Sequence, residues 1–491
     1  MFLTLLVIIP FLGSLLCWML DWIHIKISRW IALITTLILF IFSIFLWLQY
    51  FYLHDMIVLH THWNAEFIAP WIPRFGIQLH FALDGLSILM IILTTFLGFI
   101  SVLCSWDNVK KYQGFFYFNL LWIIIGTLGV LLSIDLFLFF CFWEIMFIPI
   151  YCLIIFWGDN KYSITSRIKT ANVFLIYTQL SSMVMLFSIL LLSCVYYNKM
   201  HIWTFDYNRL IHIHNINPVL EFLIMLGFFI AFTVKMPIVP LHSWLPDMHK
   251  KSPIVGSVDL SGMLVKVGAY GLIRFNMSMF TDIPYIFLYC VILLGITTIF
   301  YGSWMAYAQT NIKKIISYSS ISHMGFILIA IYSKNIISYE GAIMDMIFSG
   351  LSISALFILF NQLYIRVKTN NIVQLGGLSL CINWIPGFVL FFLFANLNVP
   401  GTANFIGEIM MLMGIFTVFP KLLGLLIFGL LFSLIYSLNI VHKVFYGSLR
   451  NTNYYQCSPI NCCEFLVIIF LLVSIIFFGF FPDNILHTVH F

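Results

Sequence analysis

Apolar runs of about twenty residues recur along this chain with little else between them. A helix needs about 20 apolar residues to cross a bilayer, and fourteen such segments begin near the following residues: Leu3, Trp30, Leu86, Phe115, Leu136, Ala171, Leu220, Ile254, Ile283, Ile315, Gly341, Ile382, Leu422 and Phe465. Charged residues make up 8% of the chain, against roughly 25% in a soluble domain. The sequence therefore predicts an all-α polytopic membrane protein with about 14 transmembrane helices.

The connections between these segments are short. The longest runs from about Tyr52 to Gly85, and we expect it to be irregular and too short for a soluble catalytic domain. Any chemistry is therefore expected within the membrane.

Basic residues are distributed unequally between the two faces of the expected membrane. When alternate loops are assigned to opposite faces, fifteen of the 23 Lys and Arg residues fall on one face. The opposite face receives Arg74, Lys199, Arg209, Lys334 and Lys421, while Lys235, Lys266 and Arg274 lie within expected helices. By the positive-inside rule the richer face is the inner one, so both termini are expected on the outer (periplasmic) face. This topology also accounts for the net charge of +5, and we expect no nucleic-acid partner.

Four ionisable side chains lie deep inside expected helices. They are Glu144 in the fifth segment, Lys235 in the seventh, Lys266 in the eighth and Glu408 in the twelfth. A charged residue at the bilayer centre costs about 3 kcal/mol on insertion scales, and such residues usually have a function. One alternative is that each acid merely neutralises a base and locks the helices together. Protonatable groups of both signs, spaced through a bilayer and linked by water, are what a proton relay requires.

Further polar residues extend this set. His323 is well inside the tenth segment, and an imidazole, whose unperturbed pKa is about 6.5, can pass protons near neutral pH. Asp259 lies two turns before Lys266 on the same face of the expected eighth helix, where it either feeds protons in or caps an ion pair. Asp345 and Arg274 are weaker candidates, since snorkelling toward an interface explains either.

The cysteine and histidine patterns favour no bound metal or redox cofactor in this chain. The ten cysteines include no C-x-x-C pair that would hold a cluster or zinc. Haem ligation normally needs histidines paired across helices, whereas most of the 14 histidines fall in loops or near helix ends.

Prolines predict two broken helices. Pro237 and Pro240 follow Lys235 in the seventh segment, and Pro400 lies in the twelfth; each removes the amide donor for the carbonyl four residues earlier. A repeat of five helices, an odd number, places its second copy upside down, as in transporters that build mid-membrane sites from broken helices. A proline kink without function is the alternative. The predicted organisation is therefore helices 1–3 in residues 1–114, two inverted five-helix repeats in 115–280 and 281–446, and a loop and last helix in 447–491.

Several motifs resemble those of a known family. Residues 234–249 (VKMPIVPLHSWLPDMH) and 256–271 (GSVDLSGMLVKVGAYG) resemble the signature of the antiporter-like subunits of respiratory complex I. The resemblance extends to Trp143-Glu144, to 317–325 (SYSSISHMG) and to 398–408 (NVPGTANFIGE), and so covers essentially all 491 residues. Relatives of the L and N types usually carry a lysine in the twelfth helix, whereas Glu408 resembles the M type, equivalent to mitochondrial subunit 4.

The resemblance implies a proton-translocating subunit in the membrane arm of NADH:quinone oxidoreductase, an enzyme of the translocase class. It implies that NADH, FMN, iron–sulfur clusters and quinone are bound by partner subunits and that this chain has no redox centre. The expected partners are L-type and N-type antiporter-like neighbours, lipids, protons and water.

The resemblance also implies roles for individual residues. The glutamate matching Glu144 pairs with the lysine matching Lys235, and the lysine matching Lys266 passes protons through a histidine region toward the acid matching Glu408. Many relatives have a histidine in the eleventh helix where this chain has Ser349. We expect a bridging water at Ser349, with His323 as the imidazole of the route.

Length and the M-type motifs favour a bacterial inner membrane over the mitochondrial inner membrane. Two other functions stay open at this point. The chain could be a subunit of a multisubunit sodium/proton antiporter, against which Glu408 argues. It could instead be a mainly structural spacer whose buried charges hold helices together.

Overall fold

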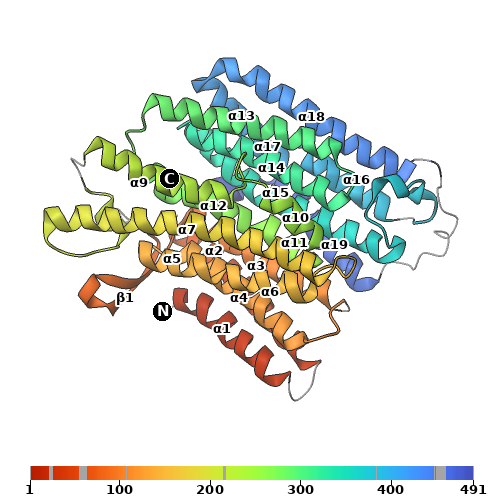
Figure 1. Ribbon diagram of the computed structural model, residues 1–491, viewed down its shortest axis with the longest axis horizontal. Coiled ribbons are helices and arrows are strands. Elements are labelled where there is room, and N and C mark those ends of the chain that lie inside the picture. Colours follow the sequence, from red (N-terminus) through yellow and green to blue (C-terminus); the bar gives the residue numbers. More distant parts are fainter. Residues whose placement is uncertain are drawn as a thin grey trace. The chain divides into compact units, whose positions relative to one another are not determined.

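The computed structural model describes residues 2–21, 26–54, 63–106, 108–213, 217–382, 384–446, 448 and 461–489. Helices dominate this part of the chain (Figure 1), and twelve of those described are long and apolar enough to cross a membrane. Helices suit this setting because all their backbone polar groups are satisfied within the segment itself. The predicted all-α polytopic class is confirmed.

The chain forms two compact units. The first contains Met1–Met236 and Met263–Pro284, and the second contains Pro237–Gly262 and Tyr285–His490. The helices of the first unit are α1 (Phe2–Leu20), α2 (Ile27–His54), α3 (Gly85–Ser105), α4 (Gln113–Leu132), α5 (Leu136–Ile145), α6 (Phe147–Trp157), α7 (Ile164–Met200), α8 (Tyr207–Leu210), α9 (Pro218–Lys235), α12 (Val265–Gly271) and η3 (Leu272–Met277). Of its spans, α3 and α4 are the most deeply buried.

The second unit is built around α14 (Ile312–Tyr332) and α15 (Ile336–Val367), whose apolar cores are wholly buried within the chain. Its other helices are α10 (Trp244–Lys251), α11 (Ile254–Asp259), α13 (Tyr285–Ala308), η4 (Ile372–Gln374), η5 (Leu378–Leu380), α16 (Ile385–Asn396), α17 (Ala403–Val418), η6 (Pro420–Leu422), α18 (Leu423–Val441), η7 (His442–Tyr446), α19 (Cys462–Phe480) and α20 (Asp483–Val489). The π-helical η2 (Leu260–Leu264) joins α11 to α12.

Each of the fourteen expected segments coincides with one helix or with consecutive helices. The breaks expected in the seventh and twelfth segments are present, after Lys235 and between Asn396 and Ala403. The exact number of spans, the two inverted repeats and the domain boundaries stay predictions.

The connection that we expected to be irregular contains a β-hairpin. Strand β1 (Ala65–Ile72) pairs antiparallel with β2 (Ile77–Leu83), so that Phe67 lies opposite Phe81, and η1 (Pro73–Phe75) makes the turn. The expectation was wrong for residues 65–83, although one strand contains Pro70. A proline is tolerated where the ladder is irregular, and the register shifts beside Pro70.

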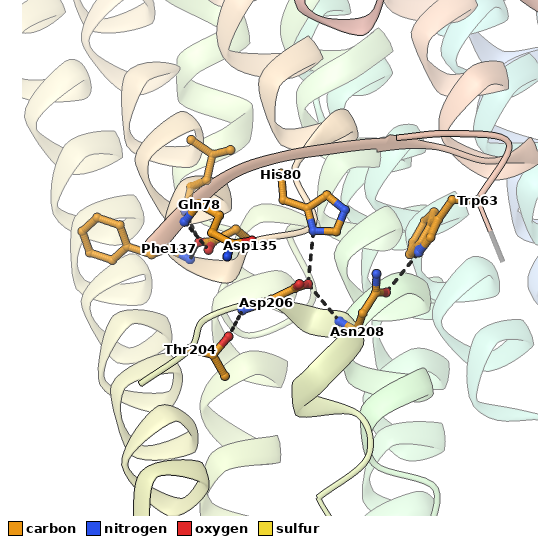
Figure 2. Close-up of polar contacts among 9 residues, drawn as sticks. Trp63, Gln78, His80, Asp135, Phe137, Thr204, Asp206 and Asn208 are labelled. Carbon is orange, nitrogen blue, oxygen red and sulfur yellow. Dashed lines mark hydrogen bonds and ion pairs between the residues drawn. The ribbon is translucent and has the colours of Figure 1, made fainter. Parts of the chain in front are cut away.

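Polar side chains fasten this hairpin to the start of α5 (Figure 2). His80 of β2 lies with its Nδ1 3.2 Å from Oδ1 of Asp206, and the same carboxylate accepts the amide of Asn208. Asp135, the residue before α5, accepts the amides of Gln78, Phe137 and Leu138. We call His80, Asp135, Asp206 and Asn208 the hairpin cluster.

The hairpin turn depends on one glycine. Gly76 has φ +68°, a left-handed backbone conformation that residues other than glycine rarely adopt. A Cβ atom at this position would lie 1.9 Å from the carbonyl oxygen of Trp203, so the backbone of the turn packs directly on the segment that precedes Asp206.

Candidate functional site

Lys235 is the last residue of α9 and is 3% exposed. The last helical hydrogen bond here runs from the Met236 amide to the Phe232 carbonyl, 2.8 Å. Pro237 cannot donate to the Thr233 carbonyl, so the helix ends as the prolines predicted. The lysine therefore sits at a buried helix terminus, at the point where the chain leaves the first unit.

The ammonium group of Lys235 lies against aromatic rings. Its Nζ is 4.0 Å from the ring centroid of Phe147 and 4.8 Å from that of Trp143. No hydrogen-bond partner for Nζ exists among the described residues. Both rings come from the fifth expected helix, which is divided at Met146 into α5 and α6.

The ion pair between Lys235 and Glu144 that the resemblance implied is absent as a direct contact in the described part of the chain. Trp143 and Phe147 are four residues apart and share one helical face, whereas Glu144 is turned by about 100° from Trp143. Glu144 is partly exposed, and its Oε1 has no hydrogen-bond partner among the described side chains and backbone. The two charged groups are neighbours without being joined.

Lys266 lies in α12 and is fully buried. Two π-helical stretches, η2 and η3, flank α12. A wider π turn is rare and frequently marks a functional site. These stretches could not be predicted from the sequence, because no residue type signals a π turn as proline signals a break.

Gly268 brings α12 against the last turn of α9. A Cβ atom on Gly268 would lie 2.8 Å from the Phe232 carbonyl oxygen and 3.0 Å from the Met236 amide nitrogen. Gly268, two residues after Lys266, therefore permits a close helix approach, and the partner is the helix end that carries Lys235.

Arg274 does not snorkel as the sequence analysis supposed. Its guanidinium forms an ion pair with Asp84, the residue that caps α3, and lies 4.8 Å from the ring centroid of Trp63. Because Trp63 also donates to Asn208 of the hairpin cluster, 3.0 Å, Arg274 connects η3 to the hairpin. Its role is structural in this arrangement.

Glu408 lies in α17 and is 6% exposed. The helix that precedes it, α16, ends at Asn396, and the intervening segment carries Asn398 with φ +56°. The Asn398 side chain hydrogen-bonds to the Glu408 carboxyl group, while Oε1 of Glu408 has no partner among the described residues. The second broken helix thus holds a buried acid beside its unwound segment.

Asp345, which the sequence indicated only as a weaker candidate, lies on a helix that packs closely beside Glu408. It is fully buried in α15, and a Cβ atom on Gly407, the residue before Glu408, would lie 2.9 Å from the Asp345 amide nitrogen. Snorkelling is therefore the wrong explanation for Asp345. The sequence signal that could have found it is the pair of glycines, Gly341 and Gly407, through which α15 and α17 approach each other.

Three other predicted residues are also buried in the second unit. Asp259 ends α11, His323 lies in α14, and Ser349 lies in α15 with no partner for its hydroxyl among the described residues. The first unit holds Glu144, Lys235 and Lys266. Within the described ranges, no group of three or more His, Cys, Asp or Glu residues could hold a metal ion.

Comparisons with known proteins show the family and the fold of this chain. A transmembrane family described as NADH:quinone oxidoreductase/Mrp antiporter matches residues 133–435. The chain is 48% identical over 491 residues to NADH-quinone oxidoreductase subunit M of Escherichia coli (strain K12), covering 100% of this chain and 96% of that protein. It is 32% identical over 489 residues to NADH-ubiquinone oxidoreductase chain 4 of Marchantia polymorpha, covering 99% and 94%.

A solved structure has the same fold. The structure of respiratory complex I from Thermus thermophilus with bound NADH contains a chain that superposes with a TM-score of 0.86 at 23% identity, covering 100% of this chain and 98% of that chain.

Proposed function

We propose that this chain, which belongs to the NADH:quinone oxidoreductase/Mrp antiporter transmembrane family, translocates protons as a membrane-arm subunit of NADH:quinone oxidoreductase. The observation that carries the proposal is the state of Lys235, a buried ammonium at a broken helix end with no hydrogen-bond partner in the described structure. A lysine that served only to hold helices together would have an acid as its partner, because an uncompensated buried charge is strongly destabilising. A lysine that loads and releases protons needs an environment in which both forms are accessible.

The proposed mechanism begins at Glu144. A change of charge at or near Glu144 alters the proton affinity of Lys235, because charges in a protein interior interact over several ångströms without direct contact. The proton then passes from Nζ of Lys235 to Nζ of Lys266. The close approach of α12 to the end of α9 at Gly268 supports this step.

In the second unit the proposed route uses His323 and then Glu408, from which the proton leaves toward the outer face. Asp259 is a secondary group for proton entry, and Ser349 holds a bridging water. Glu408 suits a terminal acceptor because one of its carboxylate oxygens has no partner among the described residues.

Redox chemistry is proposed to take place in partner subunits that bind NADH, FMN, iron–sulfur clusters and quinone. The proposed neighbours are L-type and N-type antiporter-like subunits. We place the chain in a bacterial inner membrane with both termini on the outer face, because basic residues gather on the other side.

The test is NADH-driven acidification of membrane vesicles carrying Glu144→Gln. We expect an assembled complex, judged on a native gel, that has lost proton translocation and electron transfer to quinone together. Glu221→Gln is the matched control, because Glu221 lies in the first turn of α9 and receives the same substitution. Normal translocation by an assembled Glu144→Gln complex would overturn the proposal.

The family description includes Mrp antiporters, so sodium/proton exchange is the second candidate. It requires proton movement by the reconstituted complex to depend on sodium. Glu408 argues against it, since relatives of the antiporter type usually have a lysine at the matching position. Sodium-independent translocation would remove this candidate.

A further inference from the structure

We infer that Trp143 and Phe147 form an aromatic seat that holds protonated Lys235 apart from Glu144, and so are positioning residues of the relay. This inference rests on the proposed function, and it assigns to two uncharged residues a part in controlling when Lys235 can lose its proton. Neither residue reacts.

The geometry is that of a cation–π contact. The Lys235 Nζ lies 4.0 Å from the Phe147 ring centroid and 4.8 Å from the Trp143 centroid. Both distances are well inside the limit of about 6 Å within which a ring face attracts an ammonium group. The side chains of Trp143 and Phe147 are fully buried, as is the lysine, so water screens the attraction little.

The seat replaces the contacts that a buried ammonium would normally make. An ammonium has three donors, and Lys235 uses none of them on a described residue. The ring faces are therefore the groups that the structure offers to its charge. Glu144 lies between the two seat residues in sequence, but on another helical face.

Other aromatic side chains hold the two rings in place. Trp143 packs against Phe139 and Phe232, with ring centroids 5.5 and 5.6 Å away, and Phe147 packs against Phe174 at 5.9 Å. Phe232 is one turn before Lys235 on α9. Rings from α5, α7 and α9 thus hold the seat in place and preorganise it to receive the lysine.

The arrangement gives Lys235 two alternative stabilising partners, the ring faces and the Glu144 carboxylate. When protonated Lys235 is on the rings, it is free of Glu144 and can pass one proton to Lys266, leaving Lys235 neutral and Lys266 charged. Weakening the rings lowers the population of this separated, charged state. Proton translocation should fall in proportion, while the shape of the site stays the same.

The experiment replaces Phe147 with mono-, di- and trifluorinated phenylalanine, introduced by amber suppression into the assembled complex. Fluorine withdraws electron density from the ring face with little change in size. We expect the rate of NADH-driven proton translocation by assembled complexes to fall stepwise, by about tenfold over the series, because tenfold corresponds to about 1.4 kcal/mol and lies within the range of a desolvated cation–π contact.

The control is the same series at Phe116 of α4. Phe116 is equally buried, its ring contacts Tyr117 and Trp157, and no cation of the described residues lies over it. The seat is supported if fluorination at Phe147 lowers proton translocation stepwise while fluorination at Phe116 leaves it unchanged. Equal responses at both positions, or no response at Phe147, would overturn it.

A second comparison separates ring chemistry from packing at Trp143. Trp143→Phe keeps a ring face and should retain most translocation, whereas Trp143→Leu should lose it; equal losses would overturn the seat. Failure of the seat and failure of the relay are distinguishable. If Glu144→Gln abolishes translocation but the fluorination series is flat, the relay stands and the seat does not.

Discussion

The hairpin cluster and the Lys235 site contrast sharply although they share one stretch of chain. Asp135, at the start of α5, accepts three backbone amides, and Asp206 accepts one more and contacts His80. Glu144 lies farther along this stretch and Lys235 ends α9; the Lys235 ammonium faces aromatic rings, and neither its Nζ nor Oε1 of Glu144 has a hydrogen-bond partner among the described residues. Charges with several fixed partners hold the chain in place. Charges without fixed partners can exchange one neighbouring group for another without breaking such a network.

The largest expected effect is at Lys235, whose ammonium has no hydrogen-bond partner among the described residues. Lys235→Arg keeps the positive charge but cannot release a proton near neutral pH, because the guanidinium pKa is above about 12. We expect the rate of NADH-driven proton translocation to fall to background in an assembled complex, measured as vesicle acidification. Lys199→Arg, at the end of α7, is the matched control. Normal translocation by Lys235→Arg would favour the function of a structural spacer. The Lys235 site and the hairpin cluster would then both be structural.

An intermediate effect is expected at Asp206 of the hairpin cluster, whose carboxylate has fixed partners. Asp206→Ala removes the acceptor of the Asn208 amide and the partner of His80, and a hydrogen bond to a charged group contributes about 1.5–3 kcal/mol. Hydrogen exchange of residues 65–83 should become faster by one to two orders of magnitude, while the NADH-driven proton stoichiometry of assembled complexes is kept. Glu66→Gln, on an exposed position of β1, should leave exchange unchanged. Loss of translocation in assembled Asp206→Ala would make the hairpin cluster part of the relay.

The smallest expected effect is a pH dependence of the hairpin. Burial, and to a smaller degree the charge of Asp206, raises the pKa of Asp135 from 3.8 to about 6, against the opposing effect of its backbone hydrogen bonds. Because the folded state binds this proton more tightly than the unfolded state, its contribution to stability is largest below pH 4 and is lost as the pH rises to about 6. Each pH unit across this window weakens the hairpin attachment by up to about 1.4 kcal/mol.

The measurement is hydrogen exchange of residues 65–83 at pH 5 and pH 7.5, corrected for the intrinsic rate. After this correction, the hairpin should open less often at pH 5 than at pH 7.5. Asp135→Asn should remove the part of this pH difference that Asp135 causes. An unchanged difference in Asp135→Asn would show that another group titrates.

Much of this arrangement could be predicted from residue types. Apolar runs located the helices, and Pro237 and Pro400 located the two helix breaks, because each proline removes a specific amide donor. The expected site residues Lys235, Lys266, His323 and Glu408 are buried. Their participation in a proton route stays a proposal.

The features missed from the sequence depend on contacts between distant segments. The hairpin was missed because distant residues help to hold it: Phe81 pairs with Ser133, and the Ile134 amide donates to the His80 carbonyl. Arg274 was interpreted as a snorkelling residue because nothing near it in sequence shows that Asp84 is its partner.

The sequence by itself determined that this chain crosses a membrane repeatedly, where two of its helices break and which ionisable residues lie at depth, since each of these follows from local hydrophobicity or from a proline's missing donor. Tertiary structure alone decided which ionisable residues have partners and what those partners are. Pairing depends on which helical faces meet, so Asp84 received an arginine, Asp135 received backbone amides, and Lys235 received two aromatic rings in place of the neighbouring glutamate.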